Sequence, residues 1–476
     1  MKIQSMMKQG VSWQPVEVEI SLTKGAPIVE PLGLPDVVVK DGIKRIKTAF
    51  ENSGLPWPKA QKITINFRPN HLKKTSQGLD LPMAIGILSL MNIEKRWSFP
   101  AGSYFYGEID LSGKIHQPAD LKDFVPSRGE FNIITGVGSQ NLYCQSIQVR
   151  SLVELHETLQ VPSSNALSLL KPPQLDDTLS FSKPMADLLS ILALGEHSAL
   201  LAGPAGSGKT TLANAVHSLI KNPDEESFRK IRKLHLQFGD EATWRPLVAP
   251  HHTTPTMAMI GGNVPIVPGE LSRAHGGILL LDEFLEFSPE VQEALREPME
   301  AGVVRVARKG VQKTLPAQFQ LIATTNLCPC GKFVPKNYVA CRFSLRKCRS
   351  YLERLSGPIL DRFDILSFSH KWMSSEKVSL LEIQKHVQKA REFQTYREGD
   401  VNGRQMEKDL MGDLTHSNLT AMGYIDDHLN FRRRRALLRV ARSFADLDGE
   451  EKIALKHLAQ ADKFAVRPFL EIEMLD

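Results

Sequence analysis

The stretch LLAGPAGSGKTTLANAV, residues 200–216, decides the fold of the middle of this 476-residue chain. Residues 203–210 match the complete phosphate-binding loop pattern G-x-x-x-x-G-K-[ST]. An apolar run precedes this loop, and the segment TTLANAVHSLI that follows opens a helix. Glycines let backbone N–H groups approach phosphates, and a helix N-terminus favours their negative charge. The sequence therefore predicts a strand, a loop and a helix that together bind a nucleoside triphosphate.

Two further apolar runs end in polar side chains, GGILLLDEF (276–284) and FQLIATTN (319–326). The pair at the end of the first is a Walker B arrangement, in which Asp282 holds Mg²⁺ and Glu283 polarises the attacking water. At the end of the second run, Asn326 is in a position to orient that water, which is the sensor role.

The expected cofactors are ATP and Mg²⁺. Lys209 would reach the β and γ phosphates, while Thr210 and Asp282 would hold Mg²⁺. Hydrolysis usually also needs an arginine that neutralises developing charge, for which Arg362 and Arg432 are candidates; a role as solvated basic residues is the open alternative. The expected nucleotide-binding residues are Gly203, Pro204, Ala205, Gly206, Ser207, Gly208, Lys209, Thr210, Thr211 and Asp282.

The bulk composition is that of an ordinary soluble globular protein, with 42% hydrophobic and 24% charged residues. No run of about 18 uncharged apolar residues occurs, so no transmembrane helix is expected. Because no signal-peptide pattern is recognised either, we expect a cytoplasmic protein without a membrane partner. The net charge of +6 permits a polyanionic partner but does not establish one.

Basic residues and cysteines gather at two places. Residues 302–316, GVVRVARKGVQKTLP, alternate apolar and basic positions, which indicates a β-hairpin. Arg305, Arg308 and Lys309 on it suit DNA phosphates, bound without sequence preference; a solvated turn is the alternative. Four cysteines nearby could form a structural zinc site or remain reduced thiols. These are Cys328, Cys330, Cys341 and Cys348.

Periodicity divides the chain into four parts. Residues 1–162 mix short β-like runs with helices, and residues 163–182 form a linker rich in Ser and Pro. Residues 183–371 alternate strands and helices like a parallel α/β core, and residues 372–476 are helical and charged. The expected class is α/β, with an α+β N-terminal domain, a P-loop core and a C-terminal helical lid domain. Predicted elements of the first part are strands at 16–22 and 62–67, helices at 41–54 and 79–93, and a hairpin at 104–115.

Several longer motifs resemble the magnesium-chelatase-related AAA+ ATPases. They are RPLVAPHHTTPTMAMIGGNVPIVPGELSRAHGGILLLDEF (245–284), LREPMEAGVVRVAR (295–308), ATTNLCPCG (323–331) and RLSGPILDRFD (354–364). Within that family the match is to the ComM/YifB competence-protein branch, because ENSGLPWP, LDLPMAIGIL and YGEIDLSGKI resemble its Lon-protease-like (S5-like) N-terminal domain. Gly78 stands where a Lon-type serine nucleophile would be, so this domain is expected to be proteolytically inactive.

The resemblance implies a ring, usually a hexamer, with ATP between subunits. Arg362 would be the finger that reaches a neighbour's site, and Arg432 would be the second sensor. The family further implies an ATP-driven DNA motor of helicase type that moves branch points. Such a motor binds single-stranded and branched DNA without sequence preference and helps incoming single strands to integrate during natural transformation. Insertions within 248–271 and 302–316 would project into the pore of the ring.

Two other functions fit the same motifs. The first is the ATPase subunit of a magnesium chelatase, which the long N-terminal domain and the cysteine cluster disfavour. The second is a nucleotide-gated, non-enzymatic DNA-binding scaffold. The presence of both Asp282 and Glu283 disfavours it, because a scaffold can dispense with the acid that activates water.

Overall fold

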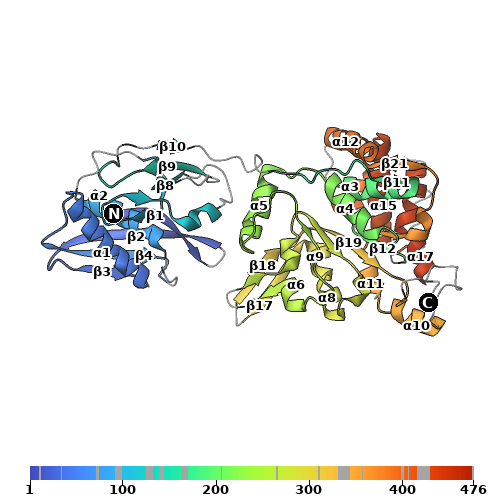
Figure 1. The fold of residues 1–476 in the computed structure, drawn as a ribbon, viewed down its shortest axis with the longest axis horizontal. Helices are drawn as coiled ribbons and strands as arrows, with labels where there is room; N and C mark the ends of the chain where they lie inside the picture. The colour runs from blue at the N-terminus through green and yellow to red at the C-terminus, as the bar shows by residue number, and fades with distance from the viewer. Residues whose placement is uncertain are drawn as a thin grey trace. The chain divides into compact units, whose positions relative to one another are not determined.

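The computed structural model divides the chain into two compact units, drawn with their elements in Figure 1. The first unit comprises residues 1–170 and 228–241, and the second comprises residues 171–227 and 242–476. The residues that the structure describes are 1–9, 12–33, 35–70, 74, 76–91, 99–124, 132–138, 144–155, 157, 159–161, 170–204, 206–263, 266–308, 311–330, 343–355, 357–397, 401–405, 407–414 and 429–473.

A four-stranded sheet with two helices forms the larger part of the first unit. Its order is β1 (Lys2–Gln9), β2 (Ser12–Lys24), β4 (Gln61–Arg68) and β3 (Val29–Leu32). Helices α1 (Val37–Asn52) and α2 (Asp80–Leu90) share one hydrophobic core with this sheet (Figure 1). Every residue of α2 except Leu90 is buried, as expected for a helix with no polar face. The strands and helices predicted for these segments are confirmed over the described residues; residues 92–93 of the second predicted helix lie outside them.

A second sheet corrects part of the predicted hairpin. β6 (Glu108–Ile109) and β7 (Ile115–His116) pair as predicted around a Ser-Gly turn. β5 (Tyr104–Phe105) instead pairs in parallel with β8 (Asn132–Gly136), so the hairpin prediction is wrong for residues 104–105. The reason is burial, since this pairing places Phe105 beside Ile134 in the hydrophobic core. The remaining strands of this sheet are β9 (Gln145–Val149) and β10 (Leu159–Val161).

Gly78 occupies a position that admits no side chain. A Cβ atom there would lie 2.3 Å from two ring carbons of Tyr106, which is fully buried. The Tyr106 hydroxyl is fixed by hydrogen bonds with Ser76 Oγ (2.5 Å) and Asp120 Oδ2 (2.8 Å). The ring therefore fills the space in which a nucleophilic side chain at residue 78 would stand.

A five-stranded, entirely parallel sheet is the core of the second unit. Its order is β13 (Leu247–Val248), β16 (Ile278–Leu281), β19 (Gln320–Thr325), β12 (Ala199–Ala202) and β20 (Ile365–Phe368). The four strands from β16 to β20 are buried at every residue, as expected of a parallel sheet covered on both faces. Because the strands are parallel, their carboxyl ends meet at one edge, where α/β proteins usually bind ligands.

Helices cover this sheet, and two short insertions interrupt its crossovers. The helices of the core are α3 (Lys183–Gly195), α4 (Lys209–Leu219), α10 (Leu345–Leu352) and α11 (Gly357–Leu360). Most of α5 (Glu225–Leu236) is grouped with the first unit. The first insertion contains α6 (Thr256–Ile260), β14 (Gly261–Gly262), β15 (Val267–Pro268) and α7 (Glu270–Arg273). The second contains α8 (Pro289–Ala294), α9 (Arg296–Ala301) and a hairpin of β17 (Val303–Arg308) with β18 (Val311–Pro316). The hairpin prediction for 302–316 is confirmed by the pairing of β17 with β18.

The end of the chain is helical, as predicted, and is drawn in orange and red in Figure 1. Asn430 caps α15 by accepting a hydrogen bond from the Arg433 backbone N–H (2.8 Å), and Gly449 ends that helix in the left-handed region. The elements are β21 (Lys377–Ser379), which pairs with β11 (Ser180–Ser182), α12 (Leu380–Tyr396), α13 (Glu407–Gly412), α15 (Phe431–Asp448), α16 (Leu455–Ala465) and α17 (Arg467–Glu473). No helix in the described ranges is both long enough and apolar enough to cross a membrane.

Candidate nucleotide-binding and hydrolysis site

The phosphate-binding loop joins β12 to α4 at the carboxyl edge of the sheet. Gly203 begins it, and a Cβ atom there would lie 1.8 Å from Ser369 Oγ, so only glycine fits. Gly206 and Gly208 have φ angles of 76° and 86°, in the left-handed region that favours glycine. The loop thus uses glycine for close approach at its start and for backbone curvature further on. The predicted binding residue Ala205 lies outside the described residues.

Lys209 stands at the start of α4 with its ammonium group turned into the loop. The Nζ atom donates hydrogen bonds to the carbonyl oxygens of Gly203 (2.9 Å) and Pro204 (2.8 Å). Burial lowers the pKa of Lys209, while the charges of Asp282 and Glu283 act in the opposite direction. The two carboxylates are therefore close enough to influence the lysine electrostatically.

The hydroxyl groups of the loop suit a triphosphate with Mg²⁺. Ser207 Oγ is buried and has no hydrogen-bond partner within the described part of the chain, so a phosphate oxygen would satisfy it. Thr210 and Thr211 are exposed on the first turn of α4. Thr210 and Asp282 offer the oxygen ligands that Mg²⁺ prefers. The residues present thus fit both expected cofactors.

The acidic pair Asp282-Glu283 follows β16 at the same edge. The Thr324 hydroxyl donates a hydrogen bond to Asp282 Oδ1 and accepts one from the Glu283 backbone N–H (3.2 Å). Glu283 has a φ of 55° and an exposed side chain, whose Oε2 lies 3.9 Å from His252 Nδ1. Sequence reasoning missed Thr324, because a hydroxyl inside an apolar strand carries no motif of its own.

Asn326 follows β19, the strand between β12 and β16. It is half-buried, and its carbonyl oxygen accepts a hydrogen bond from Thr325 Oγ1 (2.9 Å). The Thr325 carbonyl in turn accepts from the Gly203 backbone N–H (3.0 Å), which fixes the start of the loop against this strand. The structure thereby brings the loop, the acidic pair and the predicted sensor Asn326 to one edge of the sheet.

Arg362 lies at the opposite, amino edge of the sheet. It precedes β20, and its carbonyl oxygen accepts a hydrogen bond from Ser198 Oγ (3.0 Å), just before β12 begins. Its guanidinium donates to Pro358 O (2.6 Å) and pairs with Glu300 Oε1 (3.0 Å). A four-residue strand is about 13 Å long. The backbone of Arg362, at the amino edge, is therefore separated by about this length from the phosphate loop at the carboxyl edge of the same chain.

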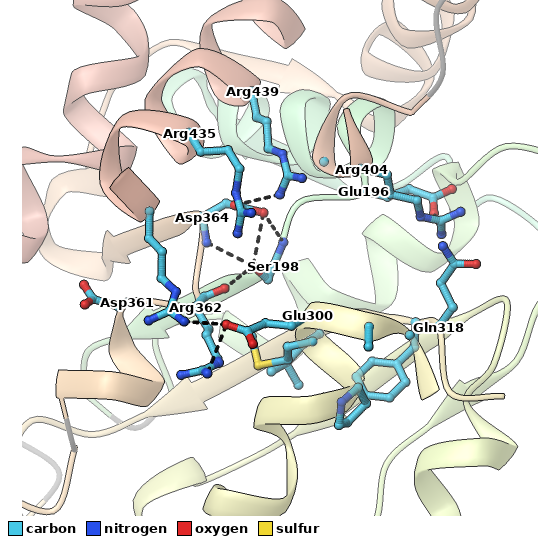
Figure 2. A pocket seen from close by; sticks show the side chains of 18 of the residues that line it. Glu196, Ser198, Glu300, Gln318, Asp361, Arg362, Asp364, Arg404, Arg435 and Arg439 are labelled. Atoms are coloured by element: carbon cyan, nitrogen blue, oxygen red, sulfur yellow. Dashed lines mark hydrogen bonds and ion pairs between the residues drawn. The ribbon is translucent and has the colours of Figure 1, made fainter. Parts of the chain in front are cut away.

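A cavity of about 740 Å³ opens at this amino edge (Figure 2). Arg432, the second-sensor candidate, is here and not at the phosphate loop, and it pairs with Glu300 Oε1 at 2.5 Å. Both candidate arginines therefore share one carboxylate. The arginines that line the cavity are Arg362, Arg404, Arg432, Arg435 and Arg439, and the carboxylates are Glu196, Glu300, Asp361 and Asp364.

Glu196 anchors the far side of this cavity. Its carboxylate binds Arg245 Nη2 (2.9 Å) and Arg404 Nη2 (2.7 Å), which joins the core to the segment before α13. Burial alone would raise the pKa of Glu196, but the charges of Arg245 and Arg404 lower it to about 2. Glu300, Asp361 and Asp364 lie within the motifs LREPMEAGVVRVAR and RLSGPILDRFD, but no role was predicted for them or for Glu196.

The predicted DNA-binding residues sit on the hairpin that follows α9. Val304 and Val306 point into the core, whereas Arg305 and Arg308 are exposed. The Arg305 guanidinium and backbone N–H both contact the carboxylate of Glu297, the backbone bond measuring 3.2 Å. Lys309 lies outside the described residues.

Two of the predicted zinc ligands come together. Cys328 and Cys348 are buried, with their sulfur atoms 3.0 Å apart, and Cys330 packs against the same core. Cys341 lies outside the described residues, and the three described cysteines do not form a group with all donor atoms within 4.8 Å. Zinc binding therefore stays a prediction.

Asp448, Glu450 and His457 do form such a group among the residues described. Lys456 Nζ contacts both carboxylates, at 2.7 Å and 2.6 Å. His457 Nδ1 accepts a hydrogen bond from the Ala454 backbone N–H at the start of α16 (2.9 Å). Because a lysine already compensates the carboxylates and the histidine caps a helix, this group is structural.

Family models match three successive parts of the chain. They are described as magnesium chelatase, subunit ChlI (residues 181–377), subunit ChlI of Mg-chelatase (residues 18–127) and the C-terminal part of magnesium chelatase, subunit ChlI (residues 378–464). The central match contains the phosphate loop, the acidic pair and Arg362.

Whole-length relatives agree with these matches. The YifB protein of Escherichia coli K12 is 32% identical over 95% of this chain and 94% of its own length. The competence protein ComM of Haemophilus influenzae is 31% identical over 96% of both chains. A more distant similarity, 23% identity over 44% of this chain and 27% of the relative, is to the DNA replication licensing factor Mcm6 of Anopheles gambiae. The chain therefore belongs to the ComM/YifB family of magnesium-chelatase-related proteins.

Proposed function

We propose that this protein is an AAA+ ATPase that assembles into a ring, usually a hexamer, and moves DNA branch points. The observation that carries the proposal is the division of the hydrolytic groups between the two edges of one parallel sheet. The phosphate loop and Glu283 lie at the carboxyl edge, and Arg362 lies at the amino edge. A chain arranged in this way completes its active site only when a second copy supplies the arginine.

Each of these groups would have a definite task in hydrolysis. Bound Mg²⁺ would neutralise charge on the β and γ phosphates. Lys209 would contact the same phosphates, Glu283 would polarise the attacking water, and Asn326 would orient it. Arg362 of the adjoining copy would neutralise the charge that develops in the transition state, with Arg432 beside it.

The partner that we propose is DNA, bound through its phosphates. The exposed Arg305 and Arg308 lie on a hairpin, and arginine side chains are common contacts of phosphate oxygens. The relative from Haemophilus influenzae is named a competence protein, which supports a role in the integration of incoming single strands during natural transformation. Movement along DNA requires contacts of this sequence-independent kind.

One experiment tests the proposal as a whole. The ATPase rate of the purified protein is measured alone, with single-stranded DNA and with a branched duplex, beside a three-strand exchange substrate. We expect DNA to stimulate hydrolysis, and ATP to drive the exchange of strands. An ATPase rate that is the same with and without DNA would refute the proposed DNA motor. A protein that stays monomeric in the presence of ATP and DNA would refute the proposed ring.

A further inference from the structure

Helix α9 carries two carboxylates that contact different parts of the proposed machinery. Glu297 binds Arg305 on the hairpin, through both the guanidinium and the backbone N–H. Glu300, three residues later, binds Arg362 in the cavity at the amino edge (Figure 2). It also binds Arg432. One helix of six residues therefore stands between the residues proposed to hold DNA and the arginines proposed to act on ATP.

Glu300 is the shared partner of these arginines. Its Oε1 lies 3.0 Å from Arg362 Nη2 and 2.5 Å from Arg432 Nη2, although the two arginines come from segments 70 residues apart. Burial opposes the ionisation of Glu300, but the hydrogen bond from Arg432 and the charge of Arg362 outweigh it and lower its pKa. Glu300 is therefore charged at neutral pH and compensates both guanidinium groups.

A compensated arginine is a poor stabiliser of a phosphate. To act in the transition state, Arg362 must present its charge to the phosphate that is being transferred. The pair of Glu300 with Arg432 is suited to exchange, because their side chains are 43% and 37% exposed and exposed ion pairs are weak. The side chain of Arg362 is 11% exposed, but the carboxylate that it meets is the same half-exposed Glu300. The polyphosphate of an adjoining copy carries more charge than one carboxylate and would compete for the same guanidinium groups.

The connection from Glu300 to the hairpin is short and rigid. Only Ala301 and Gly302 separate Glu300 from the first residue of β17. Gly302 has a φ of 66°. Its carbonyl oxygen accepts a hydrogen bond (2.8 Å) from the backbone N–H of Ala317, which directly follows β18 at the base of the hairpin. A displacement of the hairpin would therefore be transmitted to α9.

We propose that Glu300 is a positioning residue that holds Arg362 and Arg432 back, and that DNA on the hairpin moves α9 and releases them. This inference rests on the proposed function, since it assumes hydrolysis with an arginine from an adjoining copy. It adds a direction of control, because the state of the DNA-binding hairpin of one copy would set the hydrolysis rate at the site of its neighbour.

The test compares the full-length protein with Glu300→Gln, which keeps the shape of the side chain and removes its charge. ATP turnover is measured with and without single-stranded oligothymidylate. We expect kcat without DNA to rise about threefold, the size that loss of an exposed ion pair allows, and the stimulation by DNA to fall by a similar factor. The KM for ATP should not rise, because Glu300 does not line the phosphate loop and the freed arginines are the groups that would contact the polyphosphate. Glu300→Ala serves as a second variant, and thermal melting checks that each one is folded.

The matched control is Glu471→Gln. It removes a different ion pair of similar exposure, between Glu471 of α17 and Lys371 (2.7 Å), and should leave the DNA stimulation as in the wild type. An unchanged stimulation in Glu300→Gln would overturn the inference, as would an equal gain in the control. Loss of turnover in a folded, ATP-binding Glu300→Gln protein would also overturn it, because Glu300 would then promote hydrolysis. A wild-type protein without ATPase activity would instead refute the proposed function.

Discussion

The two edges of the five-stranded sheet differ in charge and in how far their residues can be recognised from sequence motifs. The carboxyl edge is acidic beyond the loop and is built from motifs that are contiguous in sequence, with Asp282-Glu283 directly after a strand. The amino edge is rich in arginine and is assembled from segments far apart in sequence, with Glu300 between Arg362 and Arg432. Neither edge alone has all the groups to which the proposed function assigns a role in hydrolysis, so that function requires an active site shared between copies of the chain.

Replacing Arg362 should have the largest effect on turnover. Loss of an arginine that acts on the transition state costs about 10³-fold or more, so we expect Arg362→Ala to be nearly inactive while it still binds ATP. The measurement is steady-state ATP hydrolysis beside binding of a fluorescent ATP analogue. A rate within a few-fold of the wild type would remove Arg362 from the site.

Glu283→Gln tests the other edge in the same way. Without the carboxylate that polarises water, we expect turnover to fall by about 10² to 10⁴-fold with ATP binding retained. Mixing this variant with Arg362→Ala then tests the sharing directly. In rings of equal mixture, about a quarter of the interfaces would combine an intact Glu283 with an intact Arg362 and regain activity. If the mixture stays inactive after its subunits have exchanged, Glu283 and Arg362 act within the active site of a single chain.

The hairpin should matter for the binding of DNA and not for the binding of ATP. Reversing the charges of Arg305, Arg308 and Lys309 to Glu should weaken binding to single-stranded DNA of any sequence, by about 100-fold at low salt. The slope of log K against log salt should fall by about two, since each lost phosphate contact contributes about 0.7. The charge-matched control reverses three exposed lysines on the C-terminal helices, Lys385, Lys389 and Lys463. Equal losses in both triple variants would show that net charge, and not the hairpin, governs binding.

Thr324→Val should give the smallest effect of the variants compared at the two edges and the hairpin. It removes the hydroxyl that orients Asp282 and accepts the Glu283 N–H, and a hydrogen bond to a charged group of this kind corresponds to about tenfold in kcat. Thr324→Ser keeps the hydroxyl and should restore the rate. A serine variant as slow as the valine variant would attribute the effect to packing in the sheet.

The carboxyl edge was predictable because its information is local. Short runs of apolar residues ending in Asp282 and Asn326 predicted buried strands, and β16 and β19 follow these runs closely. Parallel strands then bring their carboxyl ends to one edge without further information. The hairpin at 302–316 was predictable for the same reason, since Val304 and Val306 alternate with exposed residues.

The amino edge was not predictable, because its contacts join residues without any fixed spacing. Glu300 meets Arg432 across 132 positions, and Arg404 meets Glu196 across 208. A surface glutamate on a short helix has the same sequence signature whether it faces water or two arginines. The partners of short strands are hard to predict for a related reason. Phe105 pairs with the buried Ile134, which is distant in sequence, and not with a strand next to it in the chain.

The four consecutive arginines at 432–435 show that neighbouring residues of the same charge can have different structural roles. Arg433 is committed to the interior, where its guanidinium donates to the carbonyl oxygens of Ala465, Asp361 and Phe363 and stacks on Phe469 at 3.7 Å. A lysine cannot reproduce that planar fork, so exchanging Arg433 for lysine would loosen the seam between the helices and the sheet. The number of arginines at 432–435 therefore overstates the positive charge that is accessible to a polyanion.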